Sequence, residues 1–86
     1  MCIRDRGYVA LAQLELAVRV DASAVGPLAD YLYRDAVRFD LPEFQAWALV
    51  HQAESGNRAG STQLRTLACA VDNPVLRERI SFLTQR

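Results

Sequence analysis

Lysine is absent from this sequence: all ten basic residues are arginines, and ten acidic residues balance them. A chain with no net charge lacks the concentrated basic face that nucleic-acid binding requires. No apolar run approaches the roughly 20 residues needed to cross a bilayer, and the first residues lack the layout of a signal peptide. The composition therefore argues against nucleic-acid and membrane partners and leaves a protein as the expected partner.

Residues that carry chemistry are also scarce. The single histidine, His51, has only Glu54 and Ser55 as polar neighbours at a helix end, rather than the nucleophile and orienting acid of a catalytic site. The two cysteines belong to no cluster with metal-ligand spacing. We therefore predict no catalytic, cofactor-binding or metal-binding residues, and we expect that the chain is not an enzyme.

Two cysteines leave two readings of the redox environment. A disulfide between Cys2 and Cys69 stays open, but one pair is weak evidence for a secreted scaffold. The alternative, which we favour, is a reduced cytoplasmic chain in which Cys69 is buried as a small apolar residue.

What the sequence does contain is a strong helical pattern. With 86 residues, 51% of them hydrophobic and 23% charged, it has the size and composition of one small globular domain. Apolar spacing predicts helices over residues 8–20, 27–39, 42–55, 61–71 and 74–86. No alternating run of four or more residues indicates a strand, so the expected fold class is all-α.

The same spacing predicts which side chains form the core. Segment 42–55 is apolar on two adjoining stripes, one with Phe44 and Trp47 and the other with Leu49 and Val50. A helix with so wide an apolar arc is sandwiched between neighbours. In the other segments the expected core residues are Leu11, Leu14, Val18, Tyr31, Leu32, Phe39, Leu64, Leu67, Leu76, Ile80 and Leu83.

Prolines, a glycine and an asparagine mark the expected helix ends. Pro27, Pro42 and Pro74 each suit a first helical position, where a missing N–H costs nothing. Asn73 is a favourable N-cap for the last helix, and Gly56 is a favourable C-terminal stop for the third.

The chain also repeats itself. The stretch AVRFDLP (36–42) lies over ACAVDNP (68–74) with identical alanine, aspartate and proline positions, at a spacing of 32 residues. Residues 8–17 lie over residues 44–53 at a spacing of 36, with three alanines matched. A helix–turn–helix unit of roughly 34 residues is the period of an all-helical solenoid.

With this period and its matched small residues, the chain resembles the tetratricopeptide-like (TPR-like) repeats of bacterial proteins, although the usual Trp–Leu–Gly opening is missing. The resemblance implies two antiparallel helical hairpins plus a C-terminal capping helix, stacked as an α-solenoid. It also implies a protein or peptide partner on the concave surface, and a role as a non-catalytic scaffold in a signalling ATPase or transcription regulator. The candidate contact residues are Gln13, Gln45, His51 and Gln52.

Arginine in place of lysine, together with abundant alanine, is typical of GC-rich genomes and agrees with a bacterial source. Met1–Arg6 resembles the translated end of a sequencing-library adapter, so we expect these six residues to be foreign to the protein. The helical-repeat domain is then 7–86, and we expect it to be the C-terminal end of a longer chain.

Two alternative functions stay open. The first is a small independent helical bundle that self-associates through the face bearing Phe44 and Trp47. The second is an accessory helical part of an enzyme whose active site lies elsewhere.

Overall fold

The computed structural model describes residues 3–57 and 59–84, and helices account for 85% of these residues. These residues form α1 (Ile3–Val20), the 3₁₀ helix η1 (Ala22–Ala24), α2 (Val25–Arg38), α3 (Pro42–Glu54), α4 (Ser61–Leu67), the 3₁₀ helix η2 (Ala68–Ala70) and α5 (Pro74–Thr84). They contain no strand, and the all-α prediction is confirmed.

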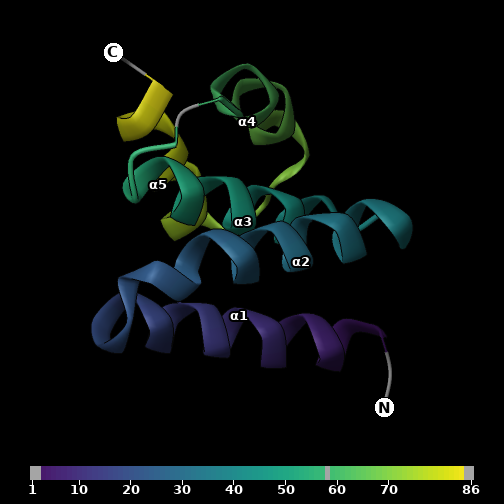
Figure 1. Cartoon of the computed structure of the whole chain (residues 1–86). Helices are drawn as coiled ribbons and strands as arrows, with labels where there is room; N and C mark the ends of the chain where they lie inside the picture. The colour runs from purple at the N-terminus through teal and green to yellow at the C-terminus, as the bar shows by residue number, and fades with distance from the viewer. Residues whose placement is uncertain (1–2, 58, 85–86) are drawn as a thin grey trace.

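The helices are layered in the order in which they occur in the chain. α1, α2 and α3 lie side by side, and α4 and α5 cover the far side of α3 (Figure 1). α3 contacts all four other α-helices, so both of its apolar stripes are covered and the predicted sandwich is confirmed. Its buried residues are Phe44, Ala46, Trp47, Ala48, Leu49, Val50, His51 and Ala53.

Alanines bring α2 and α3, the most extensively packed pair of helices, close together. Ala29 and Ala36 of α2 and Ala46 of α3 are at most 1% exposed. Side chains this small let neighbouring helix backbones approach. One result is that the Gln45 side-chain amide of α3 reaches α2 and donates a hydrogen bond to the Ala36 carbonyl (3.2 Å).

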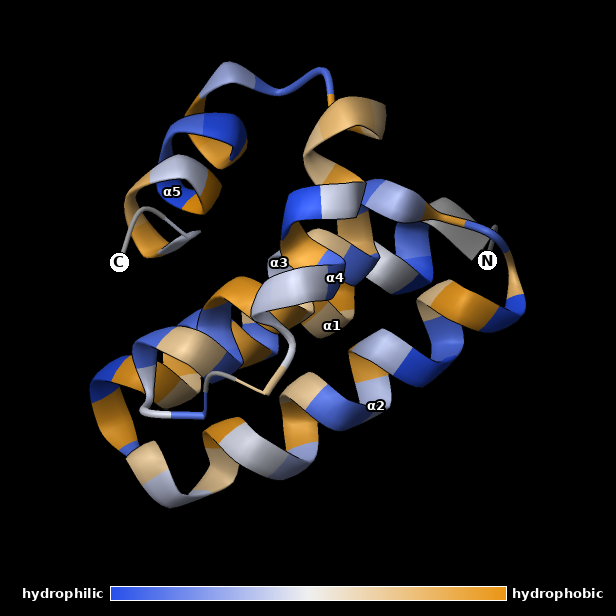
Figure 2. Ribbon diagram, turned by 90° about the horizontal axis from the view of Figure 1, so that it is seen from above, coloured by the Kyte–Doolittle hydropathy of each residue, from blue (hydrophilic) through white to orange (hydrophobic). Residues whose placement is uncertain are grey.

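Viewed from above, each helix mixes hydrophobic and hydrophilic residues along its length (Figure 2). The hydrophobic ones supply the largest fully buried side chains, which come from all five α-helices and from the segment before α5: Leu14, Leu32, Leu64, Leu76, Ile80, Val50 and Val71. The radius of gyration is 11.9 Å, close to the roughly 12 Å expected for a compact domain of this length. The all-α domain therefore has one continuous core, while its TPR-like identity stays a prediction.

α2 and α3 end in the same type of C-terminal cap. In α3 the Asn57 amide donates to the Gln52 carbonyl (2.8 Å) and the Gly56 amide to the Ala53 carbonyl (3.1 Å), the paired bonds of a Schellman motif. Gly56 has a φ of 109°, as its predicted stop role requires. α2 ends with the same pair of bonds around Asp40, the one non-glycine residue of the described chain with a positive φ (54°).

The helix starts agree with the prolines at two of three places. Asn73 caps α5, since its Oδ1 accepts from the amides of Val75 (3.0 Å) and Leu76 (3.3 Å). Pro42 is the first residue of α3, as predicted. The prediction for Pro27 is wrong by two residues, because η1 runs directly into α2 and the helix begins at Val25.

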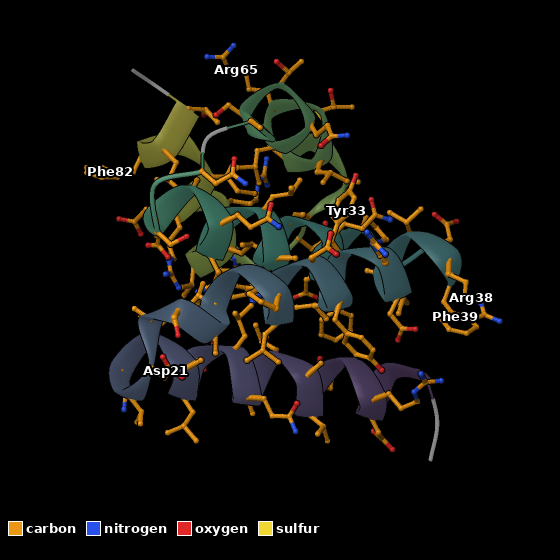
Figure 3. The ribbon with its side chains drawn as sticks, in the orientation of Figure 1. Asp21, Tyr33, Arg38, Phe39, Arg65 and Phe82 are labelled. Carbon is orange, nitrogen blue, oxygen red and sulfur yellow. The ribbon has the colours of Figure 1, made fainter. Side chains whose placement is uncertain are left out.

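Some expected core residues lie at the surface instead. Tyr31 and Val18 are 54% and 50% exposed: Tyr31 lies off the buried stripe of α2, and Val18 lies in the last turn of α1. Cys69 is a free thiol and exposed, not buried, because the α-helical period ends at Leu67 and η2 turns it outward. Phe82 of α5 is also exposed and points away from the body (Figure 3).

The start of α1 differs from the predicted range. α1 starts at Ile3, so Ile3–Arg6 continue this helix, and the Arg6 guanidinium lies 3.6 Å from the Asp35 carboxylate of α2. The foreign origin of Met1–Arg6 stays a prediction. At the other end, Gln85 and Arg86 lie outside the described residues. Among the described helices, none is both long and apolar enough to cross a membrane.

The two exposed glycines at either end of the α2–α3 unit provide a test of the cap. A Cβ added at Gly26 or at Gly56 would meet no atom within 4 Å, so the two sites differ in backbone conformation rather than in space. We expect Gly56→Ala to lower the free energy of unfolding by about 1 kcal/mol, because φ is positive there. We expect Gly26→Ala, inside a helix, to raise it by about 0.5–1 kcal/mol. Urea denaturation followed by circular dichroism measures both, and changes of equal sign would contradict the assigned cap.

Candidate binding hollow at His51

A hollow of about 380 Å³ opens where α1, η1, α2, α3 and α5 meet. Val18, Ala22 and Val25 form its apolar side. His51, Glu54, Ser55 and Arg79 form its polar side. A second hollow of about 280 Å³ shares Val18, His51 and Arg79 with the first and adds Glu15 and Arg19 of α1. The two hollows therefore adjoin each other at these three shared residues.

His51 is the one buried polar residue of the described chain, at 4% exposure. Neither of its ring nitrogens has a hydrogen-bond partner, and both are closed to solvent. A buried imidazole nitrogen without a partner is costly, since it has lost water and gained nothing in exchange. The hollow therefore contains a buried polar group whose hydrogen-bonding capacity is unused.

The aromatic and charged groups around His51 come from its own helix, α3, and from α5. Its ring stacks on Trp47, one turn earlier in α3, with centroids 6.0 Å apart and planes inclined by 26°. Arg79 of α5 lies over the Trp47 ring at 5.2 Å and forms an ion pair with Glu54. The His51 Nδ1 atom is 3.9 Å from the Glu54 carboxylate, beyond hydrogen-bond distance.

Burial and the neighbouring charges act on the His51 pKa in opposite directions. Burial lowers the pKa most, and the positive charge of Arg79 lowers it further. The carboxylates of Glu54 and Glu15 act to raise it. Burial wins, so the pKa of His51 lies below its ordinary value of 6.5 and the ring is neutral at pH 7.

Neither the Ser55 hydroxyl nor the Glu54 carboxylate is placed to act with His51 in acid–base catalysis. The Ser55 hydroxyl donates to the Gln52 carbonyl of its own helix (2.9 Å), and Glu54 is paired with Arg79. Within residues 3–57 and 59–84, no three acidic, histidine or cysteine side chains gather as metal ligands would. The absence of catalytic activity stays a prediction.

The four residues predicted to contact a partner do not share one surface. Gln13 is exposed on α1, Gln45 and Gln52 are half-buried on α3, and His51 is buried. Gln45 and Gln52 are seven positions apart and lie on one stripe of α3, but His51 lies on the stripe of Trp47. His51 therefore does not share a surface with the other three residues.

Sequence reasoning missed the role of Arg79. The guanidinium of this arginine packs on Trp47 and pairs with Glu54. Glu54 and Arg79 are separated by 25 positions in the sequence, so no local spacing could indicate their contact.

Comparison of the chain with protein-family models, curated proteins and solved structures gives no match.

The lowered pKa of His51 makes a prediction about stability and pH. Below pH 6.5 the unfolded chain binds a proton that the folded chain resists, so folding stability falls as the pH decreases from 6.5 towards the folded pKa. Above pH 6.5 this contribution is fully present. We expect the free energy of unfolding to drop between pH 7 and 5.5, by no more than about 1.4 kcal/mol per pH unit for a single group.

His51→Leu is the matched variant for this experiment, since it replaces the imidazole with an apolar side chain of similar size. We expect its stability at pH 7.5 to equal that of the parent within about 1 kcal/mol, because two unpartnered nitrogens are removed with the ring. Its stability should not change between pH 7 and 5.5. An unchanged pH dependence in this variant would show that other groups cause it.

Opposite charge changes on the ion pair should move the His51 pKa in opposite directions. Arg79→Met removes the positive charge while keeping an aliphatic stem against Trp47, so we expect the pKa of His51 to rise. Glu54→Gln removes the negative charge, so we expect it to fall. The chain has one histidine, so the ring proton resonance in an NMR titration reports this pKa directly. Shifts of the same sign would contradict the assigned arrangement of charges.

Proposed function

We propose that the chain is a non-catalytic protein-interaction module of the helical-repeat type, and that it belongs to a bacterial regulatory or signalling protein. The observation that carries the proposal is an unpaired apolar stripe on α1. The repeat period in the sequence and the TPR-like resemblance support the second part of the proposal, that the chain belongs to a regulatory protein.

The stripe, which we call the outer face of α1, consists of Val9, Ala12, Leu16 and Val20. Three of its side chains are large and well exposed: Val9 at 47%, Leu16 at 62% and Val20 at 76%. α1 is the outermost layer of the described helices, with α2 on its other side (Figure 1). Apolar side chains gathered on one face of an edge helix are typical of an interaction site.

The occupant that fits this face is another amphipathic helix. The residues of the stripe recur at positions i, i+3, i+7 and i+11, the spacing by which one helix presents itself to another. Each fully buried aliphatic side chain contributes about 1.5–3 kcal/mol, so three of them outweigh the ordering of a partner helix that is already folded. A helix of a neighbouring repeat, presented by a folded hairpin, meets this condition.

Self-association through the Phe44 and Trp47 face is not supported. These rings are only 4% and 9% exposed, and Phe44 is held by an edge-to-face contact with Tyr8 of α1 at 5.1 Å. They belong to the core of this chain and are not available to a second copy. A role as an accessory part of an enzyme has no specific observation in its favour.

A chain extended by one repeat tests the proposal. A second copy of residues 8–41 placed directly before residue 8 of the full chain supplies a helical hairpin next to the outer face. We expect a single unfolding transition with a higher midpoint than that of the parent, because stacked repeats stabilise one another through their interface. Circular dichroism during urea denaturation measures it.

The control carries Leu16→Glu in the original copy alone, because the outer face of that copy meets the added hairpin. In the parent chain this exposed substitution should change stability by less than about 0.5 kcal/mol. In the extended chain it should remove the added stability, since it places a charge in the new interface. Two separate transitions, or a midpoint equal to that of the parent, would show that the outer face does not accept a helix.

A further inference from the structure

The structure assigns a second binding site, distinct from the outer face of α1: we propose that the hollow at His51 binds a neutral aromatic group bearing a hydroxyl, such as the side chain of tyrosine or a free phenol. The inference is independent of the proposed function, because it concerns a different surface.

The charges around the hollow exclude an ionic ligand. Glu15 and Arg19 face it from α1, Glu54 from α3 and Arg79 from α5, and together they carry no net charge. Glu54 and Arg79 already neutralise each other as an ion pair. An anion or a cation entering the hollow would find no spare opposite charge to meet it.

The environment of His51 indicates that the ligand donates a hydrogen bond. The neutral ring carries one proton, and the Glu54 carboxylate, 3.9 Å from Nδ1, favours that proton on Nδ1. Nε2 is then an acceptor, and no group of the described chain donates to it. A hydroxyl supplies the missing donor, and a phenol is a stronger donor than an aliphatic alcohol.

The rest of the hollow suits an aromatic ring. Val18, Ala22 and Val25 present an apolar side, and about 380 Å³ holds one side chain the size of tyrosine with room to spare. Because the ring nitrogens are closed to solvent, entry requires a side chain to move. Arg79 lines both hollows and its side chain is 35% exposed, so it is the group that can swing outward.

NMR titration of the full chain at pH 7.5 with p-cresol tests the proposal through two unique reporters, His51 and Trp47. We expect saturable shifts of both rings, with a dissociation constant on the order of 1 mM for so small a ligand. The matched ligand 4-methylanisole has the same ring without the O–H donor and should bind about tenfold more weakly. Equal binding of the two ligands, or no saturable shift, would overturn the assignment.

Two variants locate the site on the protein. His51→Leu removes the acceptor and should reduce p-cresol binding to the level of 4-methylanisole. Ala22→Phe, at an exposed position on the rim, fills the hollow without touching the core and should abolish binding of both ligands. Circular dichroism shows whether each variant is folded. If His51→Leu is unfolded, Ala22→Phe alone tests the location of the site. Binding that persists in Ala22→Phe places the ligand elsewhere and refutes the site.

A tyrosine within a short uncharged peptide distinguishes the two sources of the phenol. Tighter binding of the peptide than of p-cresol identifies a protein partner, and tighter binding of p-cresol identifies a small molecule. In either case lowering the pH through the pKa of His51, which its NMR titration gives, should weaken binding, because protonated His51 no longer accepts a hydrogen bond at Nε2. Binding that is independent of pH would contradict the role given to His51.

Discussion

The structure depends on the burial of most of α3 between the other helices. Eight of its thirteen residues are buried, and it is the helix that contacts each of the other four α-helices. A helix can be surrounded in this way only if its neighbours come close, and the alanines of α2 and α3 allow this. The same requirement puts His51 where it is, since it lies on the stripe of α3 that neighbouring helices cover.

Packing a small number of helices around α3 has two different consequences, one at His51 and one at α1. α3 is covered so completely that its one histidine loses both water and hydrogen-bond partners. α1, the outermost layer, is covered on one side only and leaves Leu16 exposed among other apolar residues. The first situation leaves an unsatisfied acceptor in a hollow, and the second leaves an apolar surface. Each suggests a binding event of its own, one by hydrogen bonding and one by burial of apolar area.

Arg79 connects the hollow to the rest of the domain. Its guanidinium is shared between the Trp47 ring and the Glu54 carboxylate, and its charge is one of the causes that lower the pKa of His51. The side chain is thus both a packing element and an electrostatic one. An arginine suits this double role because its planar, weakly hydrated cation can lie on an aromatic ring while its N–H groups remain directed to a carboxylate.

The sequence by itself determined the all-α class, the five helices within a few residues, and the wide apolar arc of α3, because local spacing and capping residues act over one or two turns. It also located Asn73 as a cap and Gly56 as a stop for the same reason. The tertiary structure alone decided which edge residues, such as Tyr31 and Cys69, turn outward, and which distant groups meet at His51. Exposure at the edge of a stripe and the contact of Arg79 with Trp47 depend on how helices are placed against one another, and helical periodicity carries no information about that placement.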